Sequence, residues 1–159
     1  MNYSECIENA RTRIGNYCKA CPECNGRACK NQMPGPGAKG IGDTAIRNYD
    51  KWKEIRVQMD TIAENKPVDT SLELFGKKFL YPFFAGPVGA VGLHYGDCLD
   101  DVRYNDILVS ACAKYGIAAF TGDGLDSNVM VAATKAIGKT DGIGIPTVKP
   151  WNIDRKSVV

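Results

Sequence analysis

The sequence has a single histidine, His94, and no long uninterrupted apolar run. Its longest apolar stretch, around residues 79–93, is interrupted by proline and glycine and is too short to span a bilayer. The first residues contain no apolar segment like that of a secretory signal. Lysine and arginine form no cluster and the net charge is only +2, so the charge pattern gives no indication of nucleic-acid binding. We therefore expect neither a membrane nor a nucleic acid as a partner.

Length and composition indicate a globular protein of the cytoplasm. The 159 residues can bury a substantial core, and 44% hydrophobic with 24% charged residues is typical of soluble proteins. Seven cysteines in a chain without a signal indicate a reducing compartment rather than a disulfide scaffold. Three isolated cysteines are expected to be small packing residues, namely Cys6, Cys98 and Cys112.

The other four cysteines lie close together in the pattern Cys-x2-Cys-x2-Cys-x4-Cys, at Cys18, Cys21, Cys24 and Cys29. Two-residue gaps let neighbouring thiolates converge on one ion or cluster from a single loop. The run is similar to the bacterial iron–sulfur run, although the fourth spacing differs, whereas zinc usually takes two separated cysteine pairs. The pattern predicts an iron–sulfur or zinc site at these four residues, with a loop of reduced, solvent-near thiols as the alternative.

Two helices and a hairpin are expected in the first half of the chain. One helix is predicted from an N-cap at Ser4 to about Gly15, and a second from Asp43 or Thr44 to about Met59. Residues 33–42 form a loop rich in glycine and proline that no strand precedes, so they do not fit a nucleotide-binding motif. Residues 68–80 predict a small hairpin with its turn near Gly76.

Strands and helices alternate in the second half. Apolar strands are expected over 83–85, 117–121 and 142–149, with helices over 104–115 and 127–137. The first helix has an apolar stripe at Tyr104, Ile107, Leu108, Ala111, Cys112 and Tyr115. Strands separated by helices in this order predict a parallel sheet with right-handed crossovers.

Residues 81–92 combine a short apolar run with a loop rich in glycine and proline. The run at 83–85, bounded by Gly86 and Pro87, is typical of a strand buried on both faces. The glycines after it let the backbone approach a flat ligand, because no Cβ intervenes. Barrels and open α/β sheets place ligands where such strands end. An ordinary buried strand followed by a tight turn is the alternative.

Several motifs then follow one another in a recognisable order, at residues 47–56, 68–71, 75–76, 82–89 and 96–97. Together they resemble the FMN-dependent α-hydroxy-acid dehydrogenases and oxidases, such as glycolate oxidase and lactate oxidase. The resemblance runs from about Gly37 to Trp151. The cysteine-rich head is similar to that of some anaerobic bacterial members of this family.

The resemblance implies a (β/α)8 TIM barrel that holds FMN at the C-terminal ends of its strands. It divides the chain into residues 1–42, a helix with the cysteine-rich and glycine-rich loops, and residues 43–159, a partial barrel. The implied reaction is hydride transfer from a 2-hydroxy acid to flavin N5, and a homo-oligomer is compatible with it. The alternatives are a different FMN barrel enzyme and a non-enzymatic iron–sulfur or zinc module.

By the same resemblance, the flavin ring is contacted by Pro87, Val88 and Gly89 after the first strand and by Thr121 at the end of the second. Thr147 aligns with a glutamine that bonds the pyrimidine side of the flavin. Thr147 is itself a departure from the family, and two further features depart as well. Lys149 stands where a tyrosine holds the substrate, and the tyrosine expected before the Gly-Ala pair at 37–38 is missing. A hydroxy acid is therefore one candidate substrate.

Length and catalytic residues also depart from the family. A barrel of this kind takes roughly 250 residues, so we expect about three of its eight strands here. The family's base is a histidine followed three residues later by a carboxylate-binding arginine. In this sequence the residue three positions after His94 is Asp97. We interpret His94 as part of the loop after the first strand, and we name no catalytic residue in this chain. The sequence predicts a truncated or frame-shifted product that is inactive alone.

Overall fold

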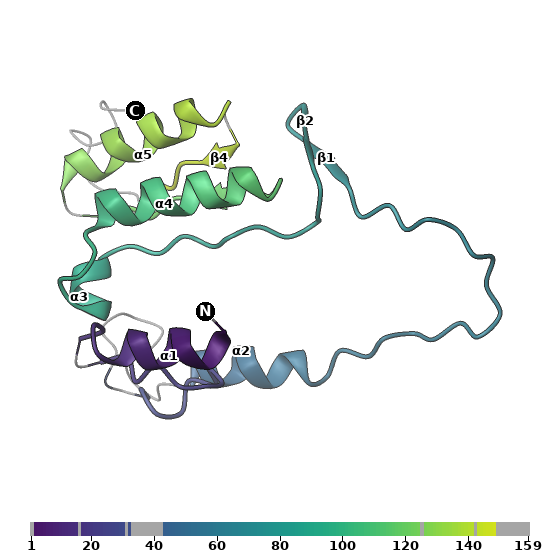
Figure 1. The fold of residues 1–159 in the computed structure, drawn as a ribbon, viewed down its shortest axis with the longest axis horizontal. Coiled ribbons are helices and arrows are strands. Elements are labelled where there is room, and N and C mark those ends of the chain that lie inside the picture. The colour runs from purple at the N-terminus through teal and green to yellow at the C-terminus, as the bar shows by residue number, and fades with distance from the viewer. Residues whose placement is uncertain are drawn as a thin grey trace. The chain divides into compact units, whose positions relative to one another are not determined.

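A computed structural model describes residues 2–15, 17–30, 32, 43–124, 126–141 and 143–148 (Figure 1). The chain divides into two compact units. The first contains Met1–Lys66 and Gly92–Cys98, and the second contains Pro67–Val91 and Leu99–Val159. The domain boundary expected after residue 42 stays a prediction.

The first helix of the first unit, α1 (Tyr3–Arg11), begins with a capping box. Asn2 Oδ1 accepts a hydrogen bond from the Glu5 amide (2.9 Å), and the Glu5 carboxylate accepts one from the Asn2 amide (3.0 Å). These bonds satisfy two amides that a helix start otherwise leaves without partners. The predicted cap at Ser4 is therefore wrong by two residues, and the helix ends at Arg11 rather than near Gly15.

The second helix, α2 (Thr44–Trp52), is shorter than predicted. The sequence led us to expect helix to about Met59, but residues 55–70 contain no helix or strand. Ile55 and Met59 are 64% and 82% exposed, so these apolar side chains have no packed partner. A short helix gains most of its stability from packing of an apolar face, and no such packing is available to extend α2 over these residues.

The predicted hairpin is confirmed at the start of the second unit. Strands β1 (Leu72–Leu74) and β2 (Lys77–Phe79) pair antiparallel, with Leu72 opposite Phe79. Phe75 and Gly76 both have positive φ (53° and 69°), as the tight hairpin turn requires. The Leu80 amide then donates to the Gly116 carbonyl (2.8 Å), which ties the hairpin to the rest of the unit.

The parallel sheet is also confirmed, although its strands are shorter than expected. β3 (Ala119–Phe120) pairs in parallel with β4 (Gly144–Ile145), and on its other side Ala119 forms a parallel bridge with Ala85. The strand expected at 83–85 is thus reduced to one bridge. β3 lies in the middle, and the strands of the described segments close no barrel.

Two helices cover this sheet. α4 (Asp101–Lys114) and α5 (Ser127–Lys139) pack side by side (Figure 1), and each begins with an aspartate cap. The core contains Val109, Cys112, Ala119 and Ala136. A short helix that was not predicted, α3 (Val91–Tyr95), precedes them.

The face of α4 that packs inward differs from the predicted stripe. Asn105, Val109 and Cys112 are buried, whereas Ile107 and Tyr115 are exposed. Burial of Cys112 confirms its packing role. The same expectation is wrong for the other two isolated cysteines, because Cys6 and Cys98 are exposed.

Replacing Gly138 by alanine should raise the free energy of unfolding by about 0.5–1 kcal/mol, because glycine costs entropy in a helix. Gly138 lies in α5, and a Cβ there would meet no atom within 4 Å. Chemical denaturation measures the change. Gly116→Ala is the matched control and should destabilise, because Gly116 has φ +69° and its Cβ would lie 2.5 Å from Leu80 Cγ. A Gly138→Ala variant less stable than the parent would contradict this packing.

Candidate functional site at the ends of the parallel strands

Three loops meet at the C-terminal end of the parallel sheet. They follow Ala85, β3 and β4, and they cover residues 86–89, 121–124 and 146–148. The predicted cofactor residues all lie in these loops, at Pro87, Val88, Gly89, Thr121 and Thr147. Parallel pairing explains why they come together, because the carboxyl ends of parallel strands lie at one edge of a sheet.

The first two loops are packed backbone to backbone. A Cβ on Gly89 would clash with the Asp123 carbonyl oxygen, and a Cβ on Gly122 would clash with the Val88 carbonyl oxygen. Only glycine permits so close an approach. The two glycines therefore fix the distance between the loop after Ala85 and the loop after β3.

Thr121 joins the second loop to the third. Its side chain is fully buried (0% exposed), and its amide donates to the Ile145 carbonyl (3.0 Å). Its Oγ1 accepts a hydrogen bond from the Thr147 amide (3.4 Å). The hydroxyl is thus enclosed and bonded to a neighbouring loop, and its contact with a flavin ring stays a prediction.

Asn105 is a site residue that the sequence reasoning missed. It projects from α4, is fully buried, and accepts a bond from the Gly122 amide (3.0 Å) while its Nδ2 donates to the Gly122 carbonyl (3.4 Å). One side chain therefore satisfies both backbone groups of Gly122. Asn105 lies off the apolar stripe predicted for this helix, so no sequence signal pointed to its burial, which depends on how α4 packs.

A family model described as FMN-dependent dehydrogenase matches residues 35–142, which is more than half of the chain. The chain belongs to the FMN-dependent dehydrogenase family. No curated protein and no solved structure matches it significantly. Membership implies FMN as the cofactor, oxidoreduction as the chemistry and the TIM-barrel class as the fold. The expected homo-oligomer and the cytoplasmic location stay predictions.

The first of the three loops, residues 86–89, is where the resemblance to the family places the flavin ring. Gly86 and Pro87 are exposed, and a Cβ on Gly86 would meet no atom within 4 Å. A flat ring can approach such a backbone closely. Val88 and Gly89 are half-buried against the second loop, which holds this surface in place. The backbone at Gly86 and Pro87 is therefore open to the approach of a flat ring, whereas the Thr121 side chain is buried and its Oγ1 accepts a hydrogen bond from the Thr147 amide.

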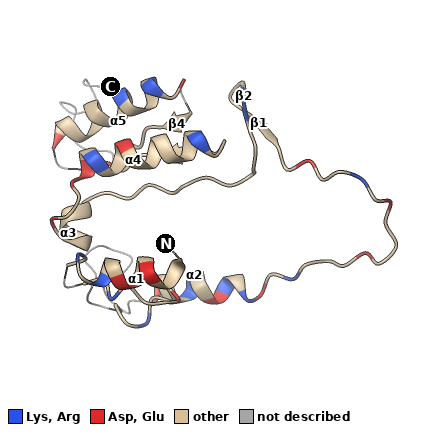
Figure 2. Ribbon diagram, in the orientation of Figure 1, with Lys and Arg blue, Asp and Glu red and all other residues tan. Residues whose placement is uncertain are grey.

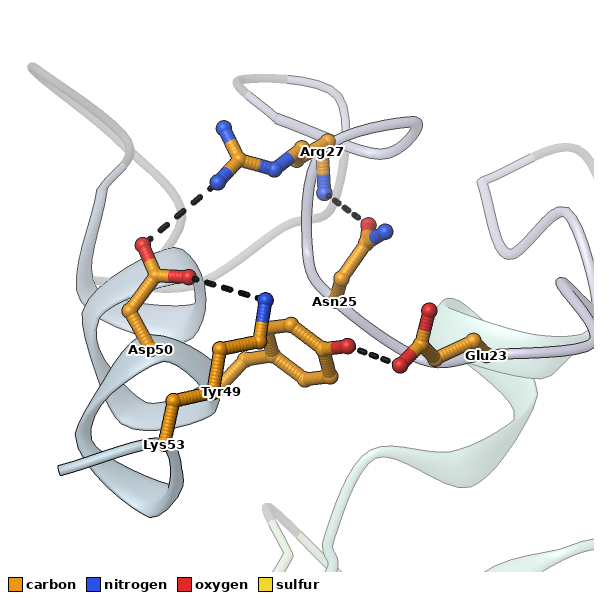
Figure 3. A network of polar contacts seen from close by, with 6 residues as sticks. All are labelled: Glu23, Asn25, Arg27, Tyr49, Asp50 and Lys53. Carbon is orange, nitrogen blue, oxygen red and sulfur yellow. Dashed lines mark hydrogen bonds and ion pairs between the residues drawn. The ribbon is translucent and has the colours of Figure 1, made fainter.

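The four clustered cysteines lie in the first unit, on the loop between α1 and α2. Tyr3 Oη donates to the Pro22 carbonyl (2.8 Å), and Arg11 Nε donates to the Ala20 carbonyl (3.3 Å). On the α2 side, Arg27 pairs with Asp50 (3.4 Å) and Tyr49 Oη bonds to Glu23, as Figure 3 shows. Both helices therefore hold this loop.

These contacts do not produce the predicted metal site. All four cysteines belong to the described residues, and within that part of the chain no group of three or more His, Cys, Asp or Glu side chains is arranged to hold a metal ion. The iron–sulfur or zinc prediction is therefore not supported. Cysteine spacing alone does not fix ligand geometry, because non-cysteine contacts to α1 and α2 help set the loop shape.

Lys149, residues 33–42 and the segment from 149 onward lie outside the described residues. His94 lies in α3 rather than in an irregular loop, half-buried, with its ring centroid 6.0 Å from that of Tyr95.

Charges of both signs are interspersed along α2 and α4 (Figure 2). Across the described segments, no helix combines the length and apolar character needed to cross a membrane.

Asn105→Ala should lower the free energy of unfolding by about 1–3 kcal/mol, because it leaves the amide and carbonyl of Gly122 buried without partners. Urea denaturation measures the loss. Ser110→Ala is the matched control, since Ser110 is exposed on the same helix and should change stability by less than about 0.5 kcal/mol. Equal stability of the two variants would show that the Asn105 bonds do not hold the loop.

Proposed function

We propose that the chain supplies the flavin-facing part of an FMN-dependent enzyme that oxidises a 2-hydroxy acid, with hydride passing to flavin N5. The family match over residues 35–142 carries this proposal. The convergence of three loops at the ends of parallel strands supports it, because α/β proteins bind cofactors at that edge.

In this proposal, the backbone of Pro87, Val88 and Gly89 faces the isoalloxazine ring. FMN, when bound, supplies the hydride acceptor, and the protein supplies binding and orientation. The loop suits that task because Gly89 is packed on Asp123 and cannot shift toward it. Thr121 and Thr147 connect the neighbouring loops behind this surface. A surface fixed before the ligand arrives loses little freedom when the ligand binds.

The substrate side of the proposal rests on charge. A 2-hydroxy acid carries a carboxylate, and a lysine ammonium is a suitable partner for it. We assign this role to Lys149, which aligns with the substrate-holding tyrosine of the family. Removal of the hydroxyl proton needs a general base within hydrogen-bond reach. The only histidine in the sequence is His94, and three residues after it stands Asp97, where the family has an arginine. We therefore expect the chain alone to bind flavin but not to turn over.

Gly89→Ala should weaken FMN binding by roughly tenfold or more, about 1.4 kcal/mol, because the added methyl group displaces the first loop from Asp123. Quenching of flavin fluorescence on titration with protein gives the Kd. Gly86→Ala is the matched control in the same loop and should bind FMN like the parent, because its Cβ enters open space. The unfolding midpoint of each variant separates loss of the loop from loss of the fold. Equal FMN affinity in all three proteins would contradict the assigned binding surface.

Glycolate or lactate added to the FMN-loaded chain without oxygen should perturb the visible flavin spectrum but not bleach it quickly. The perturbation reports a carboxylate bound beside the ring, and slow bleaching reports the missing base. Lys149→Ala should remove the perturbation, whereas Lys135→Ala, an exposed lysine on α5, should keep it.

Three other results would change this account. No response to any hydroxy acid would exclude that substrate class for the chain. Reduction by a nicotinamide nucleotide instead would favour a different FMN barrel enzyme. Rapid bleaching by a hydroxy acid would show that the chain contains its own base.

A further inference from the structure

The turn at Asn25 and Gly26 folds an asparagine side chain over the peptide bond that follows it. Asn25 Oδ1 accepts a hydrogen bond from the Arg27 amide (3.0 Å), as in an Asx turn (Figure 3). The ring that this bond closes includes both Asn25 Cγ and the Gly26 nitrogen. The carbonyl carbon of the side chain and the nitrogen of the next residue are therefore held together in one turn. Asn25–Gly26 is also the only asparagine–glycine pair in the sequence.

Both groups are set up to react with each other. The Arg27 amide donates to Asn25 Oδ1, the atom on which negative charge develops when a nucleophile adds to Cγ, and a donor at that place stabilises the charge. Among the described residues, the Gly26 amide has no hydrogen-bond acceptor, so no bond has to break before its nitrogen reacts. Glycine also has no Cβ that would obstruct the approach of this nitrogen. Asn25 is half-buried, so water reaches the turn.

Contacts with α2 leave this turn little room for a longer backbone. Gly26 has φ +73°, and a Cβ on it would lie 2.7 Å from that of Ala45, so the turn approaches the helix closely. The next residue, Arg27, pairs with Asp50 of α2 (3.4 Å), as Figure 3 shows. An extra backbone atom between Asn25 and Gly26 would therefore displace at least one of these contacts.

We propose that Asn25 is a site of spontaneous deamidation, which the turn promotes and whose isoaspartate product loosens the cysteine loop (residues 18–29) from α2. The Gly26 nitrogen attacks Asn25 Cγ, the Cγ–Nδ2 bond breaks, and ammonia leaves with the proton of the Gly26 amide, which gives a succinimide. Water then opens either carbonyl of this ring. One product is aspartate with the ordinary backbone. The other is isoaspartate, in which the backbone runs through the side chain and is one methylene group longer. This site is separate from the flavin site and does not depend on the proposed function.

The experiment incubates the full reduced chain at mildly alkaline pH and follows deamidation by trypsin digestion and mass spectrometry. Trypsin cuts after Lys19 and Arg27, so Asn25 lies in the peptide of residues 20–27. We expect this peptide to gain the mass that exchange of NH2 for OH adds, and to become a substrate of isoaspartyl methyltransferase. Asn65 is the internal control, because it is exposed in a segment without helix or strand, and it should stay unchanged over the same time.

Unfolding and a variant separate the effect of the turn from that of the sequence. In urea at the same pH the Asx turn is lost, so deamidation of Asn25 should slow by about tenfold or more, because the Arg27 amide no longer stabilises the developing charge. Asn25→Asp is the matched control, with the product's charge on an ordinary backbone. Its amides in residues 23–29 and 44–52 should exchange with deuterium like those of the parent, whereas those of the aged chain rich in isoaspartate should exchange faster.

Three results would overturn the proposal. The first is deamidation of Asn25 that is no faster in the folded chain than in urea, which would make it a property of the sequence alone. The second is an unchanged peptide of residues 20–27 after an incubation that deamidates Asn65. The third is an aged chain rich in isoaspartate that exchanges deuterium like Asn25→Asp, which would show that the longer backbone keeps the contacts with α2.

Discussion

The backbone contact between Val88–Gly89 and Gly122–Asp123 is the constraint on which the candidate site depends. It brings the end of the segment at Ala85 against the end of β3, and it exists because both positions facing the carbonyls are glycine. Asn105 completes it from α4, by bonding both backbone groups of Gly122. A single side chain thus couples the helix that covers the sheet to the loop that follows β3.

This constraint explains how so short a sheet can support a defined site. β3 and β4 are paired over two residues each, so the strands alone fix little. Val109 and Ala136 pack with Ala119 of β3 in the core, and the loops that follow β3 and β4 bond to one another through Thr121 and Thr147. The surface at Gly86 and Pro87 is therefore placed by packing on one side and by glycine contacts on the other. Such advance positioning is what flavin binding requires from the protein.

Much of this arrangement could be predicted from the sequence, because it follows from local patterns. Apolar runs closed by glycine predicted the parallel order, and the motif at residues 82–89 pointed to a loop that lies at the C-terminal end of the sheet. Asn105 could not be assigned, since its partner depends on how α4 packs on β3. The end of α2 depends on whether Ile55 and Met59 find a partner, and they do not. The cysteine spacing alone could not fix the geometry of its loop for a related reason, because contacts such as Arg27 with Asp50 help shape the loop.

Hydrogen–deuterium exchange with and without FMN tests the central claim most directly, because it reports on each loop separately. The account predicts that the amides of Gly89, Thr121 and Gly122 exchange slowly as one group, since the three loops are bonded together. It also predicts that FMN slows exchange further in residues 86–89 and leaves the cysteine loop at 18–29 unchanged. Protection by FMN confined to the cysteine loop, or no protection at residues 86–89, would contradict the account.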